Sequence, residues 1–175
     1  MKDHISAMIV AGLLAVPTHG WAQTAPDSIF IPTELTEIRH QEASLTIRDA
    51  AGELHVYAPA DLEALPTYSV ETTTPWRDTP ARFEGVMLSD LLERHGLSSL
   101  DQIHVVAEND FVSEIPREVW ESGAVMVATR VDGQPHTRRS RGPIQFIIPM
   151  ERYNADSRFA AQHLVWMASE IRPAD

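Results

Sequence analysis

The chain contains no cysteine among its 175 residues. This absence excludes disulfide bonds, cysteine nucleophiles and zinc sites built on thiolates, so the stability of the fold has to come from packing. Basic residues are also scarce, because 14 Lys and Arg stand against 25 Asp and Glu and give a formal net charge of −11. An acidic chain of this kind is repelled by nucleic acid and by anionic lipid, so neither is expected as a partner.

Long hydrophobic runs are lacking as well, because the run from Ile5 to Val16 is shorter than the roughly 20 residues that a membrane-spanning helix needs. Gly20 and Ala22 place small residues at the −3 and −1 positions of a cleavage site. Residues 1–22 are therefore predicted to be a signal peptide. The mature protein is expected to be periplasmic or secreted, with no membrane insertion after cleavage; the alternative is an uncleaved N-terminal anchor.

The remainder of the chain, after the predicted signal peptide, has about the size of one ordinary domain. Residues 23–44 carry Pro26 and Pro32 among mixed polar residues and predict an extended N-terminal arm. The folded unit is expected to start near Leu45, so that residues 45–175 form a single domain.

Short alternating segments, separated by turn residues, dominate this domain. A hairpin is predicted around Gly52, and Leu88 to His95 has apolar residues at helical spacing, with Gly96 as its C-terminal stop. The pattern predicts an α+β fold, a single mixed, strand-rich domain with a few short helices. Strands are expected at residues 45–48, 54–57, 67–74, 102–107, 111–115, 125–131, 143–149 and 164–171, short helices at 59–65, 88–95 and 116–121, and a polar connection at 77–81.

Four motifs occur in a characteristic order: Phe83–Leu92, Ala107–Phe111, Asp132–Pro135 and Arg141–Pro149. Taken together they resemble the sulfite-oxidase-type molybdopterin-binding domain, over roughly residues 45–171. The resemblance implies an exported domain that, in active members, holds a pterin-bound molybdenum centre, and it makes molybdopterin the implied cofactor.

In active members of this family one cysteine thiolate ligates the metal. Counting back from Gly85, that position falls at Thr72 or Thr73, where no thiol is present. A threonine hydroxyl is a poor replacement for a soft thiolate donor. The expected function is therefore non-catalytic, either ligand binding or modulation of a partner protein. Two alternatives stay open: a molybdopterin-dependent oxidoreductase acting on a small oxo-substrate in the periplasm, and a purely structural interaction module.

Arg138, Arg139 and Arg141 form the one basic cluster of the acidic chain. Guanidinium groups bind phosphate and carboxylate through paired hydrogen bonds. The cluster therefore suggests an anionic small ligand, such as a pterin phosphate, or the acidic patch of a periplasmic or membrane protein partner. The alternative is a solvated loop whose arginines pair with nearby glutamates.

Three further side chains are candidates for ligand contact: Trp76, Asp110 and His136. Each also has an ordinary structural interpretation, since Asp110 can cap a turn, His136 can lie exposed in one, and Trp76 can pack in the core like Trp120 and Trp166. The sequence offers no paired histidines at metal-binding spacing, so neither a metal ligand nor a catalytic residue is assigned. The candidate cofactor-binding set comprises Thr72, Thr73, Trp76, Asp110, His136, Arg138, Arg139 and Arg141.

Overall fold

A computed structural model describes residues 27–174 of the chain. The predicted signal peptide and its cleavage site lie outside the described residues. Eleven strands occupy the described part, and they are β1 (Ile31–Pro32), β2 (Leu45–Arg48), β3 (Leu54–Tyr57), β4 (Tyr68–Thr74), β5 (Arg77–Met87), β6 (Gln102–Ala107), β7 (Val112–Pro116), β8 (Met126–Val131), β9 (Gln134–Pro135), β10 (Gln145–Ile147) and β11 (Ala168–Pro173).

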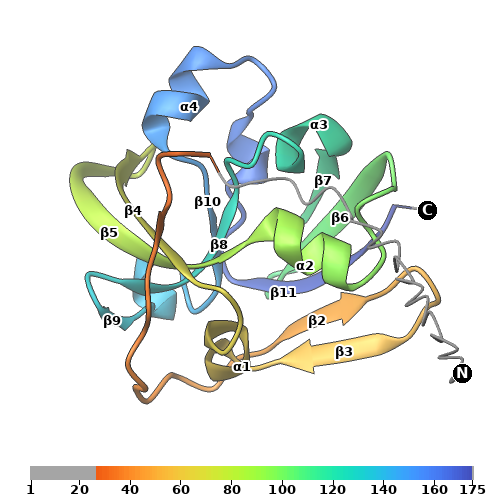
Figure 1. The fold of residues 1–175 in the computed structure, drawn as a ribbon, viewed down its shortest axis with the longest axis horizontal. Coiled ribbons are helices and arrows are strands. Elements are labelled where there is room, and N and C mark those ends of the chain that lie inside the picture. Colours follow the sequence, from red (N-terminus) through yellow and green to blue (C-terminus); the bar gives the residue numbers. More distant parts are fainter. Residues whose placement is uncertain (1–26, 175) are drawn as a thin grey trace, which may run out of the picture.

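The strands form two sheets (Figure 1). The six-stranded sheet has the order β1-β4-β5-β8-β10, with β9 paired to β8, and the five-stranded sheet has the order β3-β2-β11-β6-β7. Neighbouring strands are antiparallel except for β11 and β2, which run parallel. The predicted hairpin is present, with Leu45 opposite Tyr57 and Gly52 at a positive φ of 86° in the turn.

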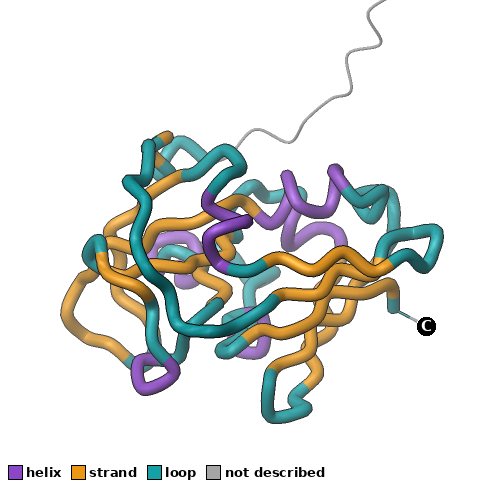
Figure 2. Tube along the Cα trace, turned by 90° about the horizontal axis from the view of Figure 1, so that it is seen from below, coloured by secondary structure: helices purple, strands orange, loops and turns teal. Residues whose placement is uncertain are grey.

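Helices are short and lie between the strands rather than forming a layer of their own (Figure 2). They are α1 (Pro59–Glu63), α2 (Leu88–Arg94), α3 (Arg117–Trp120), α4 (Met150–Ala155) and the 3-10 turns η1 (Arg138–Ser140) and η2 (Ala161–His163). The expected strand-rich α+β fold with a few short helices is confirmed.

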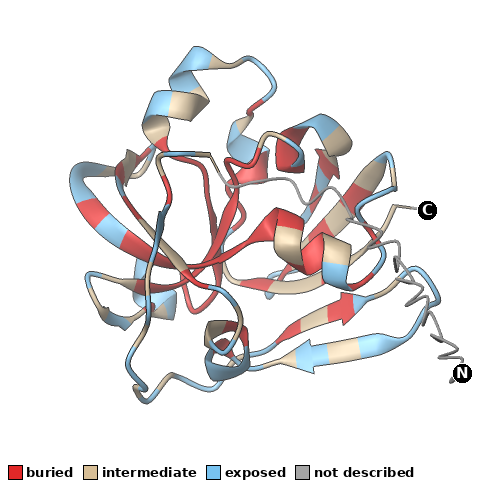
Figure 3. Ribbon diagram, viewed as in Figure 1, coloured by how far each residue is buried: buried red, intermediate tan, exposed pale blue. Residues whose placement is uncertain are grey.

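Helix α2 carries the centre of the core. Its side chains Leu88, Leu91 and Leu92 are fully buried, because their spacing places them on one face of the helix. They join a single apolar cluster with Ile47 of the five-stranded sheet and Phe146 of the six-stranded sheet. Figure 3 shows α2 largely buried, whereas β3 at the sheet edge is largely exposed.

Gly85 explains why the Phe83–Leu92 motif contains a glycine. A Cβ atom added to this residue would lie 2.1 Å from the carbonyl oxygen of Val127, on the neighbouring strand β8. The register between β5 and β8 shifts at this point, between Glu84 and Gly85. Only a residue without a side chain permits the two backbones to come this close.

Three expected boundaries were wrong. Residues 77–81 are not a connection but the first part of β5, since Thr72 pairs with Ala81 and Thr74 with Arg77. Asp78, Thr79 and Pro80 are exposed and only Ala81 is buried, so the side chains give little sign of a strand. The strand expected over residues 143–149 is limited to β10, and residues 164–167 precede β11 instead of belonging to it. Helix α4 had no sequence prediction.

The expected start of the folded unit near Leu45 is too late. Residues 27–44 are extended, as predicted, but they pack against the domain. Phe30 is buried in an apolar cluster beneath β4 and β5, and Ile31 of β1 pairs with Ser69. Asp27 accepts two hydrogen bonds from the guanidinium of Arg152 in α4, at 2.5 and 2.7 Å. These contacts show that the folded unit begins at or before Asp27.

A buried ion pair also binds the N-terminal segment, at Thr36. Arg130 of β8 donates to both carboxylate oxygens of Glu63, at 2.9 and 2.5 Å, and to the carbonyl oxygen of Thr36 at 2.7 Å. Glu63 also accepts a hydrogen bond from Thr129 at 2.6 Å and contacts His40 at 3.0 Å. The pair thus joins α1, β8 and the N-terminal segment.

Candidate functional site

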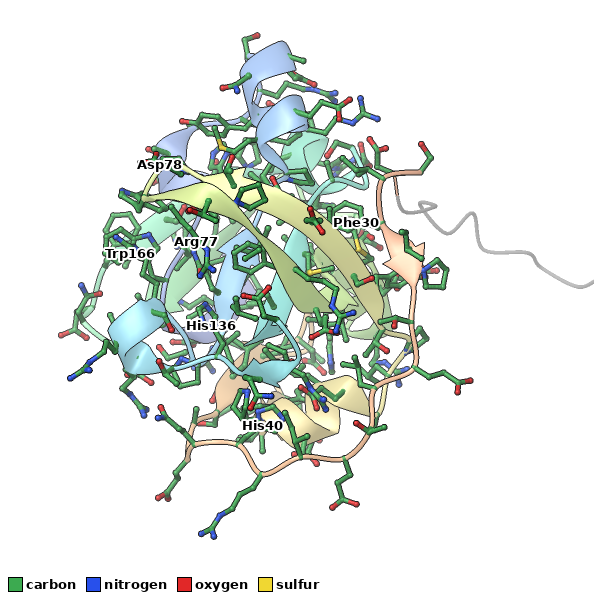
Figure 4. All side chains as sticks on the ribbon, turned by 90° about the vertical axis from the view of Figure 1, so that its left-hand side faces the viewer. Phe30, His40, Arg77, Asp78, His136 and Trp166 are labelled. Atoms are coloured by element: carbon green, nitrogen blue, oxygen red, sulfur yellow. The ribbon has the colours of Figure 1, made fainter. Side chains whose placement is uncertain are left out.

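A pocket of about 360 Å³ lies where three connections meet: the β4–β5 turn, the β6–β7 turn and the segment from η2 to β11. We call it the aromatic pocket. Figure 4 shows Trp166, one of its residues, on the same edge of the molecule as Arg77 and Asp78, which follow Trp76 at the β4–β5 turn. Its lining consists of Trp76, Ala107, Asn109, Phe111, Ala161, Gln162, Leu164, Val165, Trp166 and Met167.

Two tryptophans and one arginine form a unit at the pocket wall. The rings of Trp76 and Trp166 meet edge to face, with centroids 4.8 Å apart. The guanidinium of Arg141 lies 5.4 Å from the centroid of Trp76 and 4.9 Å from that of Trp166, within cation–π range of both. Of the arginines predicted to bind an anion, Arg141 therefore holds the tryptophan pair. Trp120, by contrast, is buried in the core.

Backbone hydrogen bonds hold this wall in place. The N–H of Met167 donates to the carbonyl oxygen of Arg141 at 3.1 Å, and the carbonyl oxygen of Met167 accepts from the N–H of Glu108 at 2.8 Å. Met167, Arg141 and Asp110 all have positive φ values, of 49°, 79° and 64°. Residues other than glycine seldom adopt this conformation, and such residues concentrate at functional sites.

Thr72 and Thr73 lie at the end of β4, before the turn that carries Trp76. The hydroxyl of Thr72 is engaged, because it accepts from the N–H of Met150 at 2.9 Å and donates to the carbonyl oxygen of Thr73 at 3.0 Å. The β4–β5 register shifts between Thr72 and Thr74, so Thr73 occupies the irregular position. Neither Thr72 nor Thr73 is among the residues that line the pocket.

The remaining arginines and Asp110 lie outside the pocket lining. Arg138 makes a paired salt bridge with Glu108, at 2.7 and 2.8 Å, and these hydrogen bonds raise the pKa of its guanidinium. Its charge is thus already neutralised by a nearby glutamate. Arg139 is exposed, and Asp110 is exposed at the tip of the β6–β7 turn, between the lining residues Asn109 and Phe111.

His136 is a buried residue, not the exposed turn residue of the alternative interpretation. It is 3% exposed, and its Nε2–H donates to the side-chain oxygen of Gln145 at 2.7 Å. Burial lowers the pKa of His136, so the ring is neutral near pH 7.

A Cβ on Gly142 would lie 2.6 Å from the His136 ring, which places the 141–142 backbone directly against it. Within residues 27–174, Gln145 Nε2 and Arg141 Nε are buried donors without an acceptor.

One carboxylate–histidine group occurs in the described part of the chain, although no metal site was predicted. Asp49, Glu53 and His55 each place a ligand atom within 4.8 Å of the others, at the β2–β3 turn. Asp49 accepts hydrogen bonds from the N–H groups of Ala51 and Glu53 and contacts His55 Nε2 at 2.9 Å. These bonds are those of a side chain that closes a turn.

The two-sheet, strand-rich α+β architecture is that of the sulfite-oxidase-type molybdopterin-binding fold. The family model for the oxidoreductase molybdopterin binding domain matches residues 33–155, and the chain belongs to this family. The resemblance inferred from the motif order is thereby confirmed.

Among solved structures, the chain is similar to the sulfane dehydrogenase SoxCD from Paracoccus pantotrophus, with a TM-score of 0.59 and 15% sequence identity. The match covers 78% of this chain but 39% of the other, so the chain spans about two fifths of that protein's length. A similarity at this identity shows the fold alone. No curated protein matches the sequence. In residues 27–174 no helix has both the length and the apolar character to cross a bilayer.

The residues present do not fit a thiolate-ligated molybdenum centre. The sequence has no thiol, and of the two residues at the expected ligand position, Thr72 already uses its hydroxyl in two protein hydrogen bonds. Arg141 Nε and Gln145 Nε2 are donors rather than acceptors, and both atoms are buried, so neither can replace a metal ligand. The predicted ligand position therefore offers no thiolate.

Sequence reasoning missed most of the pocket lining. Phe111, Leu164, Val165 and Met167 belong to segments that were interpreted as strands, and Trp166 was assigned to packing. Their connections meet only in the tertiary structure. The available signal was the concentration of large apolar residues at segment ends, where exposed side chains are normally polar.

Proposed function

We propose that this chain is an exported, non-catalytic member of the oxidoreductase molybdopterin binding domain family that binds a small ligand in the aromatic pocket. The observation that carries the proposal is the threonine pair at the metal-ligand position: it supplies no thiolate, and Thr72 is committed to the N–H of Met150. The pocket supports the binding role, since its volume of about 360 Å³ falls within the range of small-molecule sites.

Modulation of a periplasmic or membrane protein partner is the other form of this non-catalytic role. Exposed apolar side chains favour it, because Phe111 and Trp166 line the pocket and Val112 follows Phe111 in the chain. Redox turnover of a small oxo-substrate is the second candidate function. It is favoured by the family match over residues 33–155.

Metal analysis of protein purified from its own periplasm tests the proposal. We expect far less than one molybdenum per chain and no oxidation of sulfite or reduction of a sulfoxide. The variant Thr73→Cys restores a thiol at the irregular position of β4, and Thr72→Cys serves as its matched control. Molybdenum bound only by Thr73→Cys would identify the missing thiolate as the cause. Stoichiometric molybdenum with turnover in the unmodified protein would refute the non-catalytic role.

A further inference from the structure

The aromatic pocket has a composition that restricts its ligand. None of its ten lining residues carries a charged side chain. An anion that entered it would lose its hydration without gaining an ionic partner. Two arginines of the basic cluster are engaged elsewhere, since Arg138 pairs with Glu108 and the guanidinium of Arg141 lies over the two tryptophan rings.

A cationic ligand is disfavoured for a different reason. Cations bind to aromatic faces, but the guanidinium of Arg141 already lies over the rings of both Trp76 and Trp166. A second positive charge against the same rings would be repelled by Arg141. The pocket therefore disfavours both anionic and cationic ligands.

The lining instead offers aromatic rings and two neutral amides. Trp166 and Phe111 are 37% and 45% exposed, a high value for such large apolar side chains, so a bound ring would bury surface that is now in contact with water. The side-chain oxygen of Asn109 accepts a hydrogen bond from the N–H of Phe111 at 3.4 Å. Asn109 and Gln162 are thus the polar groups available to a ligand.

The wall is also preformed. Ser113 is buried and donates to the carbonyl oxygen of Gln162 at 2.7 Å, and Phe146 of β10 donates its N–H to the carbonyl oxygen of Val165 at 2.8 Å. Together with the bonds of Met167, these contacts fix the 161–167 segment to both sheets. A preformed apolar wall lowers the ordering cost of binding.

We propose that the aromatic pocket binds a neutral, planar aromatic compound of one or two fused rings, with its polar edge at Asn109 and Gln162. This deepens the proposed ligand-binding function, on which it rests, by naming the ligand class. The class differs from a small oxo-anion, which an uncharged lining does not accommodate. The pocket volume of about 360 Å³ lies near the lower end of small-molecule sites, which suits a compound of this size.

The test uses the neutral naphthalene dye prodan, with the naphthalene sulfonate ANS as its anionic counterpart. Titration followed by dye fluorescence and by quenching of tryptophan emission should give one prodan site per chain and at least tenfold weaker binding of ANS. Tighter binding of ANS than of prodan would overturn the neutral-ligand assignment.

Variants locate the site. Trp166→Ala and Phe111→Ala should each weaken prodan binding about tenfold, whereas Val56→Ala, which alters an exposed apolar side chain on β3 outside the pocket, should leave it unchanged. Because Phe111 is half exposed, its replacement tests the site even if Trp166→Ala fails to fold. Equal affinity in Phe111→Ala and Val56→Ala would refute the pocket as the binding site. The molybdenum assay is independent, so failure of dye binding and failure of the non-catalytic role are separate results.

Discussion

Replacing Glu63 by Gln tests the contribution of the buried ion pair between α1 and β8 to stability. The side chains of Glu63 and Arg130 are 8% and 4% exposed, and the carboxylate receives two hydrogen bonds from the guanidinium. Glutamine retains one oxygen as an acceptor but removes the charge, so the guanidinium of Arg130 is left buried without its ionic partner. Removing one member of a buried ion pair costs about 3–5 kcal/mol.

The exposed pair of Glu108 and Arg138 provides the matched control. Its side chains are 31% and 47% exposed, and exposed pairs contribute about 0–1 kcal/mol, so Glu108→Gln should change stability little. Urea unfolding at pH 7, followed by far-ultraviolet circular dichroism, measures both variants. With a slope of about 1–3 kcal/mol per molar urea, Glu63→Gln should lower the midpoint by about 1 M or more. Equal midpoints for the two variants would contradict the buried-pair reasoning.

The pH dependence provides a second check. Desolvation alone would raise the pKa of Glu63, but hydrogen bonds from Arg130, Thr129 and His40 outweigh it and hold this pKa below its ordinary value. The stabilisation is therefore fully present above the unfolded-state pKa, at about 4.3, and is lost as the pH falls through the lower folded-state value. The stability gap between the unmodified protein and Glu63→Gln should persist from pH 7 to about 5 and narrow below about 4. A gap that stays constant would exclude an ionised Glu63 as its source.

Three further predictions concern the core, the sheet and export. Leu91→Ala should lower the free energy of unfolding by about 2–5 kcal/mol, since this leucine is fully buried; a loss under about 0.5 kcal/mol would contradict its place in the core. Gly85→Ala should cost at least about 1–3 kcal/mol, because the new Cβ would overlap the Val127 carbonyl 2.1 Å away, and an unchanged melting temperature would refute that contact. Intact-mass measurement of exported protein should show cleavage after Ala22, and a mass that retains residues 1–22 would favour the N-terminal anchor.

The elements with strong local patterns were predicted well. The leucine spacing of α2, the Gly52 hairpin and the alternation of β6 each depend on neighbours in sequence, and the structure confirms them. Residues 77–81 show the limit of this reasoning, because Asp78, Thr79 and Pro80 are exposed while the segment pairs with β4 through its backbone. The pattern of apolar and polar side chains predicts burial, so it gives little signal where most residues of a strand are exposed.

For the candidate site too, some features could be predicted from the sequence and others could not. Counting residues from Gly85 predicts the metal-ligand position at Thr72 or Thr73, and residue type, a property of the sequence alone, shows that neither is a thiol. The partners of the arginines could not be found by counting. Arg138 pairs with Glu108, thirty positions away, and Arg141 lies over Trp76 and Trp166, from two other connections.

The sequence by itself thus determined the fold class, the acidic charge and the absence of any thiolate, because composition and periodicity depend directly on the order of residues. Only the tertiary structure decided that the segment from Asp27 is part of the domain, that His136 is buried, and that an uncharged aromatic pocket exists. The physical reason is that each of these depends on which loops meet at the ends of the two sheets. That meeting is fixed by the closure of the common core around α2, which brings distant segments together irrespective of their local pattern.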